Sequence, residues 1–210
     1  MAGKTLYLGL NPPKDEEGIV HFPVIHIKTF PVETPSIIKM MSDWEAYTHL
    51  VLTSKSAVKA VDSYCSHFDC QREGKVGIAV GKATAKEMES CGFSVDHIAQ
   101  REQAEGILEV LECLELGEAS ILWPHSALSR NVLSDYFLKK KLHVKDVVVY
   151  DTLPVDTDLA NAPDLEQFKK IIFTSPSTVD AFLGIYGTLN VVPELIAIGP
   201  ITRDRLCQLH

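Results

Sequence analysis

The sequence LVLTSKSAV at residues 50–58 decides the fold, because it returns as IIFTSPSTV at residues 171–179. Each copy is a short apolar run, typical of a buried strand, followed by a Thr-Ser-x-Ser turn and then by apolar residues at helical spacing. A strand that leads through a tight turn into a helix is the repeating unit of α/β sheets. The two copies therefore predict the same unit twice, about 120 residues apart.

Two more pairs of segments repeat in the same order and at nearly the same separation. IAVGKAT at residues 78–84 returns as IAIGPIT at 196–202, and KTFPVE at 28–33 returns as DTLPVD at 151–156. This separation is far longer than the period of solenoid repeats, which is roughly 20 to 50 residues. The three ordered pairs therefore predict an internal duplication of a whole α/β unit.

The rest of the chain continues the alternation of strands and helices, which is typical of parallel sheets. The apolar patterns predict strands at 49–52, 76–80, 120–123 and 147–150, and helices at 102–116 and 128–142. We therefore predict the α/β class, with two doubly wound parallel-sheet domains that arose by internal duplication.

The third repeated pair has a different pattern, because residues 24–32 and 147–155 are extended and each is interrupted by a proline. We interpret them as a two-stranded connector between the domains, with a cleft between the domains. The predicted boundaries are 1–27 plus 157–210 for domain one, 34–146 for domain two, and 28–33 and 147–156 for the connectors.

The composition excludes several classes of protein. The 210 residues are 46% hydrophobic and 23% charged, which is ordinary for a folded domain and excludes disorder. A formal net charge of −8 argues against a nucleic-acid partner. No apolar run approaches the roughly 18 residues of a membrane span, and the N-terminal run is too short for a signal peptide. Five cysteines without a Cys-x-x-Cys pair indicate reduced thiols in a cytoplasmic protein, with no metal site.

Four turns follow predicted strands and precede predicted helices, where open α/β sheets bind their ligands. They lie at residues 53–56, 81–84, 174–177 and 199–202. Free backbone N–H groups, hydroxyls and the positive end of the helix dipole suit carboxylates and phosphates. The alternative for any one turn is plain helix capping by Ser or Thr. Because the four turns recur in both copies, we favour binding of an anionic ligand.

Other chemistries have weaker support in the sequence. Neither a P-loop nor a Gly-x-Gly-x-x-Gly motif is present. Ser126 follows the predicted strand at 120–123, but it lacks the Gly-x-Ser-x-Gly elbow of a hydrolase, so capping is the simpler role. Tyr150 ends the predicted strand at 147–150, where the other copy has Ile27. Its hydroxyl could donate a proton to a leaving group, or the ring could simply pack at the strand end.

The ordered series of motifs resembles the uroporphyrinogen-III synthase family over residues 47–206. TSKSAV at 53–58 is similar to the family's first turn, and VGKATA at 80–85 with GFSVD at 92–96 is similar to the second. A loop with Arg130 and the strand VYDT at 149–152 follow in the same order. FTSPS at 173–177 and IGPIT at 198–202 are similar to the turns of the other domain.

This resemblance implies a lyase of heme biosynthesis that closes linear hydroxymethylbilane to uroporphyrinogen III, with inversion of the last pyrrole ring and loss of water. It also implies two α/β domains joined by a two-stranded connector, no cofactor, a small-molecule substrate as partner, and a cytoplasmic monomer. Tyr150 is the catalytic candidate. The candidate substrate-binding residues are Thr53, Ser54, Ser56, Gly81, Lys82, Thr84, Ser126, Arg130, Ser175, Ser177, Gly199 and Thr202.

The sequence departs from the family pattern in domain one, which we therefore expect to be the smaller domain. GLNP at residues 9–12 replaces the usual Thr-Arg-Pro, and residues 11–18 show no helical pattern. Two alternatives to the synthase therefore stay open: a non-catalytic two-domain binder of small anions, and a divergent synthase-like pseudoenzyme.

Overall fold

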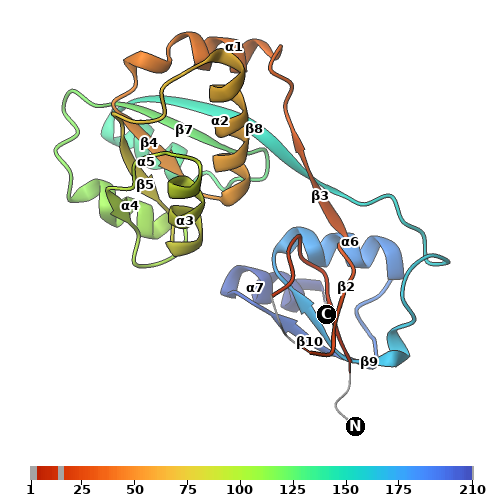
Figure 1. The fold of residues 1–210 in the computed structure, drawn as a ribbon. Coiled ribbons are helices and arrows are strands. Elements are labelled where there is room, and N and C mark those ends of the chain that lie inside the picture. The colour runs from red at the N-terminus through yellow and green to blue at the C-terminus, as the bar shows by residue number, and fades with distance from the viewer. Residues whose placement is uncertain (1–3, 14–16, 210) are drawn as a thin grey trace. The chain divides into compact units, whose positions relative to one another are not determined.

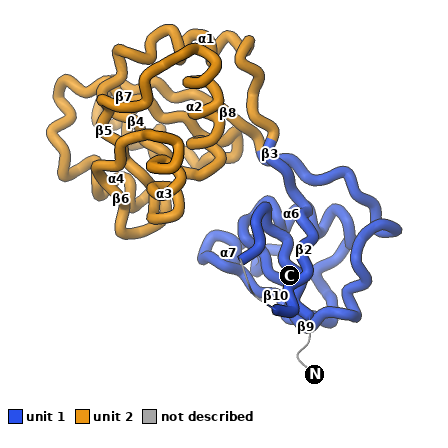
Figure 2. Tube along the Cα trace, in the orientation of Figure 1, with its two compact units in different colours: residues 1–27, 152–210 blue, residues 28–151 orange. Residues whose placement is uncertain are grey.

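The computed structural model describes residues 4–13 and 17–209, and the chain divides into two compact units. Unit 1 comprises Met1–Ile27 and Thr152–His210, and unit 2 comprises Lys28–Asp151 (Figure 2). Unit 1 is discontinuous in sequence, whereas unit 2 is one continuous stretch. Each unit is built around its own mainly parallel sheet, so the predicted α/β class is confirmed.

Unit 2 contains a sheet in the order β3-β8-β7-β4-β5-β6 (Figure 1). The pairs from β8 through β6 are all parallel, with Leu50 opposite Gly77 and Leu122. The central strands are apolar and buried on both faces, as parallel strands usually are. The strand bounds are β3 Ile25–Thr29, β4 His49–Leu52, β5 Val76–Ala79, β6 His97–Ile98, β7 Ser120–Ser126 and β8 His143–Pro154.

Helices cover both faces of this sheet, because successive side chains of a strand point to opposite faces. Val51 packs in one core with Ile107 and Phe137, which belong to α4 and α5. Leu50 and Leu52 point to the other face, where α2 contacts β4 and packs beside α3. The helix bounds are α1 Pro35–Ser42, α2 Lys55–Phe68, α3 Lys82–Ser90, α4 Ala104–Glu112 and α5 Val132–Lys140, with a 3-10 turn η1 at Trp44–Ala46.

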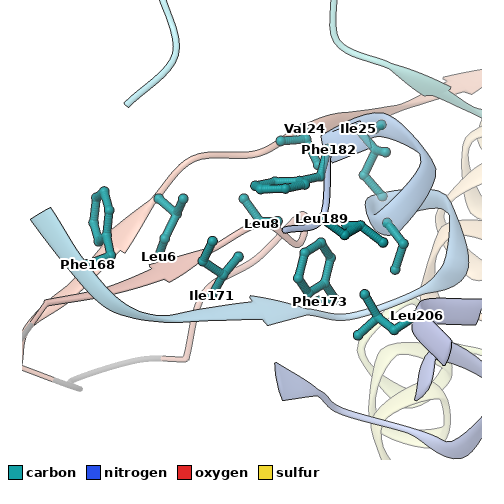
Figure 3. Close-up of a cluster of buried hydrophobic side chains, with 12 residues drawn as sticks. Leu6, Leu8, Val24, Ile25, Phe168, Ile171, Phe173, Phe182, Leu189 and Leu206 are labelled. Carbon is teal, nitrogen blue, oxygen red and sulfur yellow. The ribbon is translucent and has the colours of Figure 1, made fainter. Parts of the chain in front are cut away.

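Unit 1 contains a smaller parallel sheet in the order β10-β9-β1-β2. Its core joins Leu6 and Leu8 of the N-terminal segment to Ile171, Phe173 and Phe182 from the other end of the chain (Figure 3). The element bounds are β1 Lys4–Tyr7, β2 Ile19–His21, η2 Leu165–Gln167, β9 Phe168–Phe173, α6 Pro176–Tyr186, β10 Glu194–Ala197 and α7 Pro200–Leu209.

The duplication that the sequence predicts is visible in the two topologies. In unit 2 the chain runs β4-α2-β5-α3, and in unit 1 it runs β9-α6-β10-α7. The neighbouring strand is β7 in the first case and β1 in the second, so β7-β4-β5 and β1-β9-β10 are equivalent sheet orders. The repeated sequence segments therefore occupy equivalent places in two sheets.

The segments where the chain passes between the units are neighbouring strands, β3 and β8. Phe30 N–H donates to the Val149 carbonyl at 3.0 Å, and Val155 N–H donates to the Val24 carbonyl at 2.9 Å. Residue numbers rise in one strand as they fall in the other, so this pair is antiparallel. The Tyr64 hydroxyl of α2 donates to the carbonyls of both Phe30 and Val149, at 2.7 and 3.2 Å. Burial raises the pKa of Tyr64 to about 12, so it remains a neutral donor.

Five of the six predicted elements differ in their bounds from the structure. β5 ends one residue before the predicted 76–80, and β7 continues three residues beyond the predicted 120–123, to Ser126. The helix predicted at 102–116 is confined to α4 (Ala104–Glu112), and the one predicted at 128–142 is confined to α5 (Val132–Lys140). Apolar residues at helical spacing continue beyond each helix, but turns that are hydrogen-bonded to their own backbone end it earlier. The strand predicted at 147–150 extends from His143 to Pro154, because residues 143–146 pair with β7 and the residues beyond Tyr150 lie beside β3.

Candidate functional site

The carboxyl ends of the parallel strands in unit 2 lie at one edge of the sheet, so the residues that follow them gather there. Thr53 and Ser54 follow β4, Gly81 follows β5 by two residues, and Ser126 is the last residue of β7. Ser126 is opposite Tyr150 of β8 in the β7–β8 ladder. The structure thus brings the first two predicted turns, Ser126 and Tyr150 to one edge.

Tyr150 and Ser54 form the central pair of this edge. Their hydroxyl oxygens lie 2.9 Å apart, and either hydroxyl can be the donor. Ser54 is also the N-cap of α2, where its Oγ accepts from the Ala57 N–H at 3.0 Å. Tyr150 is only 7% exposed and lies within β8, not at the end of a strand as predicted. The helix cap therefore fixes the serine, and the serine fixes the phenol.

The backbone around Ser126 positions Tyr150 from the other side. The β7–β8 register shifts between His125 and Ser126, and the Ala127 N–H then donates to the Tyr150 carbonyl at 2.9 Å. Ser126 Oγ accepts from the Leu128 N–H at 3.1 Å. This closed turn is why α5 does not begin at residue 128. Ser126 therefore closes a local turn and does not cap α5, whose N-cap is Asn131, so the capping role expected as the simpler alternative is wrong.

His125 and Asp146 hold the end of β7 in place. The His125 ring stacks on Trp123, with ring centroids 4.0 Å apart, and one ring nitrogen is 2.8 Å from the Ser126 carbonyl. The other ring nitrogen contacts the Asp146 carboxylate, which also accepts from Ser134. Burial alone would raise the pKa of Asp146, but hydrogen bonds from His125 and Ser134 and the charge of His125 lower it on balance. Neither His125 nor Asp146 was a candidate from the sequence.

The α3 turn is occupied by a carboxylate of the protein itself. The Lys82 N–H donates to Glu102 Oε1 at 3.0 Å. A Cβ at Gly81 would lie 2.6 Å from the Glu102 carboxyl carbon, so this close approach depends on glycine. Thr84 is 5% exposed on the inner side of α3. The N-terminal turn of α3 thus already contacts a carboxylate, Glu102, and its binding of a ligand stays a prediction.

The positive charge of Arg130 is also paired with a carboxylate of the protein itself. Its guanidinium makes a two-point contact with Glu105 at 2.7 and 2.9 Å. Hydrogen bonding from Arg130 lowers the pKa of Glu105 to about 2, although partial burial of the carboxylate acts to raise it. The ion pair ties the first turn of α4 to the loop before α5. A ligand carboxylate that binds Arg130 would compete with Glu105.

At the equivalent edge of unit 1 a serine again caps the helix that follows the strand, but its hydroxyl contacts another serine instead of a tyrosine. Ser175 is the N-cap of α6, and it forms a capping box with Thr178. Ser175 Oγ lies 2.8 Å from Ser177 Oγ, so the two predicted site serines contact each other. A Cβ at Gly199 would meet no atom within 4 Å, so the α7 turn is open. Thr202 is 3% exposed, like Thr84 in unit 2.

The uroporphyrinogen-III synthase family model, described as Uroporphyrinogen-III synthase HemD, matches residues 16–210. The chain belongs to this family. A protein of Methanothermobacter thermautotrophicus described as “Putative uroporphyrinogen-III synthase” is 26% identical over 200 residues, which are 88% of this chain and 77% of that protein. The family membership predicted from the ordered motifs is therefore confirmed.

Solved structures of the family share the fold. Uroporphyrinogen-III synthetase from Helicobacter pylori 26695 superposes with a TM-score of 0.67 at 19% identity, covering 98% of this chain and 88% of that one. A mutant uroporphyrinogen III synthase from the extremely thermophilic bacterium Thermus thermophilus gives 0.66 at 16% identity, covering 99% and 89%. At these identities the likeness concerns the fold alone.

The described residues lack two other features, a helix that could span a membrane and a cluster of side chains that could hold a metal ion. No helix within residues 4–13 and 17–209 is long and apolar enough to cross a membrane. The same residues contain no group of three or more His, Cys, Asp or Glu side chains arranged to hold a metal ion.

Proposed function

We propose that the chain is a uroporphyrinogen-III synthase that closes hydroxymethylbilane to uroporphyrinogen III, with inversion of the last pyrrole ring and loss of water. The proposal rests on family membership, and one observation in the site supports it most directly: the Tyr150 hydroxyl held against Ser54 at 2.9 Å. This pair is a positioned proton donor at the edge of the sheet where α/β proteins bind ligands.

The Ser54–Tyr150 pair can act in two hydrogen-bonded states. Ser54 Oγ already accepts from the Ala57 N–H, which leaves its own proton free to point at the Tyr150 oxygen. In that state the Tyr150 proton is directed away from Ser54 and toward a bound ligand. In the other state Tyr150 donates to Ser54. We propose that substrate binding selects the first state.

The chemical step then needs little from the protein beyond position and one proton. The C–O bond of the hydroxymethyl group breaks, the oxygen leaves with the electron pair, and Tyr150 supplies the proton that makes it water. The pyrrole nitrogen lone pair stabilises the carbocation that remains. A ring carbon at the other end of the chain attacks this cation, rearrangement through a spiro intermediate inverts the last ring, and the released proton balances the reaction. Holding the two ends together supplies the remaining acceleration.

The substrate's carboxylates are the second part of the proposal. Ser56, Lys82 and Ser177 lie in the first turns of α2, α3 and α6, where N–H groups and hydroxyls favour anions. Thr84 and Thr202 are buried, so we assign them to shaping the turns rather than to direct contact. The other proposed contacts are Thr53, Gly81, Arg130, Ser175 and Gly199. A monomer in the cytoplasm is also part of the proposal.

A coupled assay tests the reaction. Hydroxymethylbilane is generated in situ, the protein is added, and the uroporphyrin isomers are separated after oxidation. We expect the III isomer to dominate, whereas the substrate alone closes to the I isomer. A pure I isomer with the folded protein would refute the proposal and would favour the non-catalytic binder of small anions.

A further inference from the structure

A basic surface covers the end of α5 and the start of β8 in unit 2, away from the Tyr150 edge. Residues 139–145 contain four of the chain's 20 Lys and Arg residues, and Asp146 is the first acid after them. Lys139, Lys140 and Lys141 are exposed. In the part of the chain that the structure describes, no ion pair joins any of these four lysines to a carboxylate.

An apolar groove lies beside these lysines. Its volume is about 420 Å³, and its apolar walls are Phe137, Leu138, Leu142 and Val144. Leu138 is 77% exposed at the rim, which is unusual for a leucine with open apolar space beside it. Lys141 also lines the groove. Lys145 alternates with Val144 and Asp146 along β8 and therefore points to the other face of the sheet. We call the groove and Lys139, Lys140 and Lys141 the α5–β8 patch.

The carboxylate that lines the groove, Asp146, already has hydrogen-bond partners within the protein. Its partners are His125 and Ser134. The groove therefore offers an apolar interior with the unpaired charge of Lys141 at its rim, and Lys139 and Lys140 lie beside it in the last turn of α5. A ligand that matches it is apolar at one point and negative around that point.

Helix stability accounts for only part of this patch. Lysines in the last turn of a helix interact favourably with its dipole, which is sufficient for Lys139 and Lys140. It does not account for the exposed Leu138. The strand rises about 3.3 Å per residue, so Asp146, the groove residue nearest to the edge, is roughly 13 Å from Tyr150 along β8. The patch is therefore separate from the proposed catalytic edge.

We propose that the α5–β8 patch binds an acidic segment of a partner protein, which inserts one apolar side chain into the groove. Anchors of this kind fill pockets at the centre of protein interfaces, while surrounding charges steer the encounter. The apolar walls are recessed and only Leu138 projects, which suits one inserted side chain better than the apolar plane of a membrane surface. The overall charge of −8 disfavours a nucleic acid.

Binding of a synthetic peptide tests this proposal without any measurement of turnover. The probe is a fluorescein-labelled acidic peptide with a single phenylalanine flanked by glutamates, and the readout is fluorescence anisotropy. We expect saturable binding that weakens several-fold as salt rises from about 50 to about 200 mM, because the rim charges are screened. Replacing the peptide's phenylalanine by glycine should weaken binding by about tenfold.

Matched variants locate the binding. Leu138→Asp and Lys141→Glu should each weaken binding by about tenfold, whereas Lys86→Glu, an equal charge change on α3, should leave it within about twofold. Leu138 is exposed, and unchanged circular dichroism will show that Leu138→Asp still folds.

Three results would overturn the proposal. These are no binding at about 1 mM peptide, equal binding by the peptide without phenylalanine, and binding that Leu138→Asp does not change. Anionic lipid vesicles and a single-stranded oligonucleotide serve as comparison probes. Patch-dependent binding of either one without binding of the peptide would replace the protein partner by that class.

Discussion

The serine turns of the two units share one backbone but have different partners. Ser54 and Ser175 have φ/ψ of −163°/154° and −159°/162°, and each caps the helix that follows. Ser54 Oγ contacts the Tyr150 phenol, whereas Ser175 Oγ contacts its neighbour Ser177. The duplication thus kept the cap, which stabilises both helices. The two turns differ in the second hydrogen bond, which reaches the Tyr150 phenol in unit 2 and the Ser177 hydroxyl in unit 1.

The glycine turns differ in a similar way. Gly81 lies against the Glu102 carboxylate, whereas the space around Gly199 is open. A carboxylate of the substrate would therefore have to replace an internal one at α3 but not at α7.

Tyr150→Phe should lower the rate of III-isomer formation by roughly tenfold to a hundredfold, because it removes the proton donor. Activity should remain, since positioning of the substrate is unaffected. Tyr186→Phe is the matched control, because it removes a phenol bound to the Pro163 carbonyl at 2.9 Å in unit 1. The isomer assay measures both variants. An equal loss in the two, or none in Tyr150→Phe, would contradict the role of Tyr150.

Ser54→Ala and Ser175→Ala should each destabilise their own unit by about 1 kcal/mol through loss of a helix cap. Only Ser54→Ala should also lower turnover, because it leaves Tyr150 without its partner. Urea unfolding separates the two effects, since both tryptophans, Trp44 and Trp123, lie in unit 2. Ser54→Ala should shift the urea midpoint measured by fluorescence. Ser175→Ala should leave that midpoint unchanged and should shift only the circular-dichroism transition of unit 1, which is not detected by tryptophan fluorescence. A fluorescence shift in Ser175→Ala would show that the units do not unfold independently.

Glu102→Ala should lower the KM for hydroxymethylbilane by about two- to fivefold, because it frees the α3 N-terminus for a substrate carboxylate. It should also cost a few tenths of a kcal/mol in stability, through the lost bond to the Lys82 N–H. Glu118→Ala is the control for the change in net charge, since Glu118 is exposed. A higher KM in Glu102→Ala would instead make Glu102 a structural part of the site.

Arg130→Gln should have the smallest effect, and the effect should depend on pH. Glu105 has a folded pKa of about 2, below its ordinary 4.5, so the ion pair stabilises unit 2 fully above about pH 5 and loses this effect as pH falls toward 2. Both side chains are partly exposed, so we expect less than about 1 kcal/mol. Urea midpoints by tryptophan fluorescence should differ between wild type and variant more at pH 6 than at pH 3, where Glu105 is still ionised in the folded state but part of the effect is already lost. A difference as large at pH 3 as at pH 6 would contradict this origin.

The local features of the fold could be predicted from the sequence because a few adjacent residues encode them. The bounds of β4 match the prediction residue for residue, and β5 differs by one residue. The serine turns were found as motifs because capping needs only a hydroxyl and the next three residues. The family follows from the order of such motifs.

The features that could not be predicted join residues far apart in the sequence. Ser54 and Tyr150 are 96 residues apart, Lys82 and Glu102 are 20 apart, and Glu105 and Arg130 are 25 apart. Glu102 and Glu105 lie in or before an amphipathic helix, where acids are ordinary and nothing marks them as partners of a turn. Residues 143–146 of β8 were missed because their strand conformation depends on pairing with β7.

The position of β1 between β2 and β9 has a consequence for biosynthesis. Tyr7 pairs with Ile172, so the N-terminal strand leaves the ribosome long before its partner has been translated. At about 5 to 20 residues per second, this delay is roughly 8 to 30 seconds. Unit 2 is continuous and can fold within that time, while Leu6 and Leu8 still lack their core partners. The nascent chain therefore presents the apolar β1 segment until β9 has been translated, and such a segment is of the kind that chaperones bind.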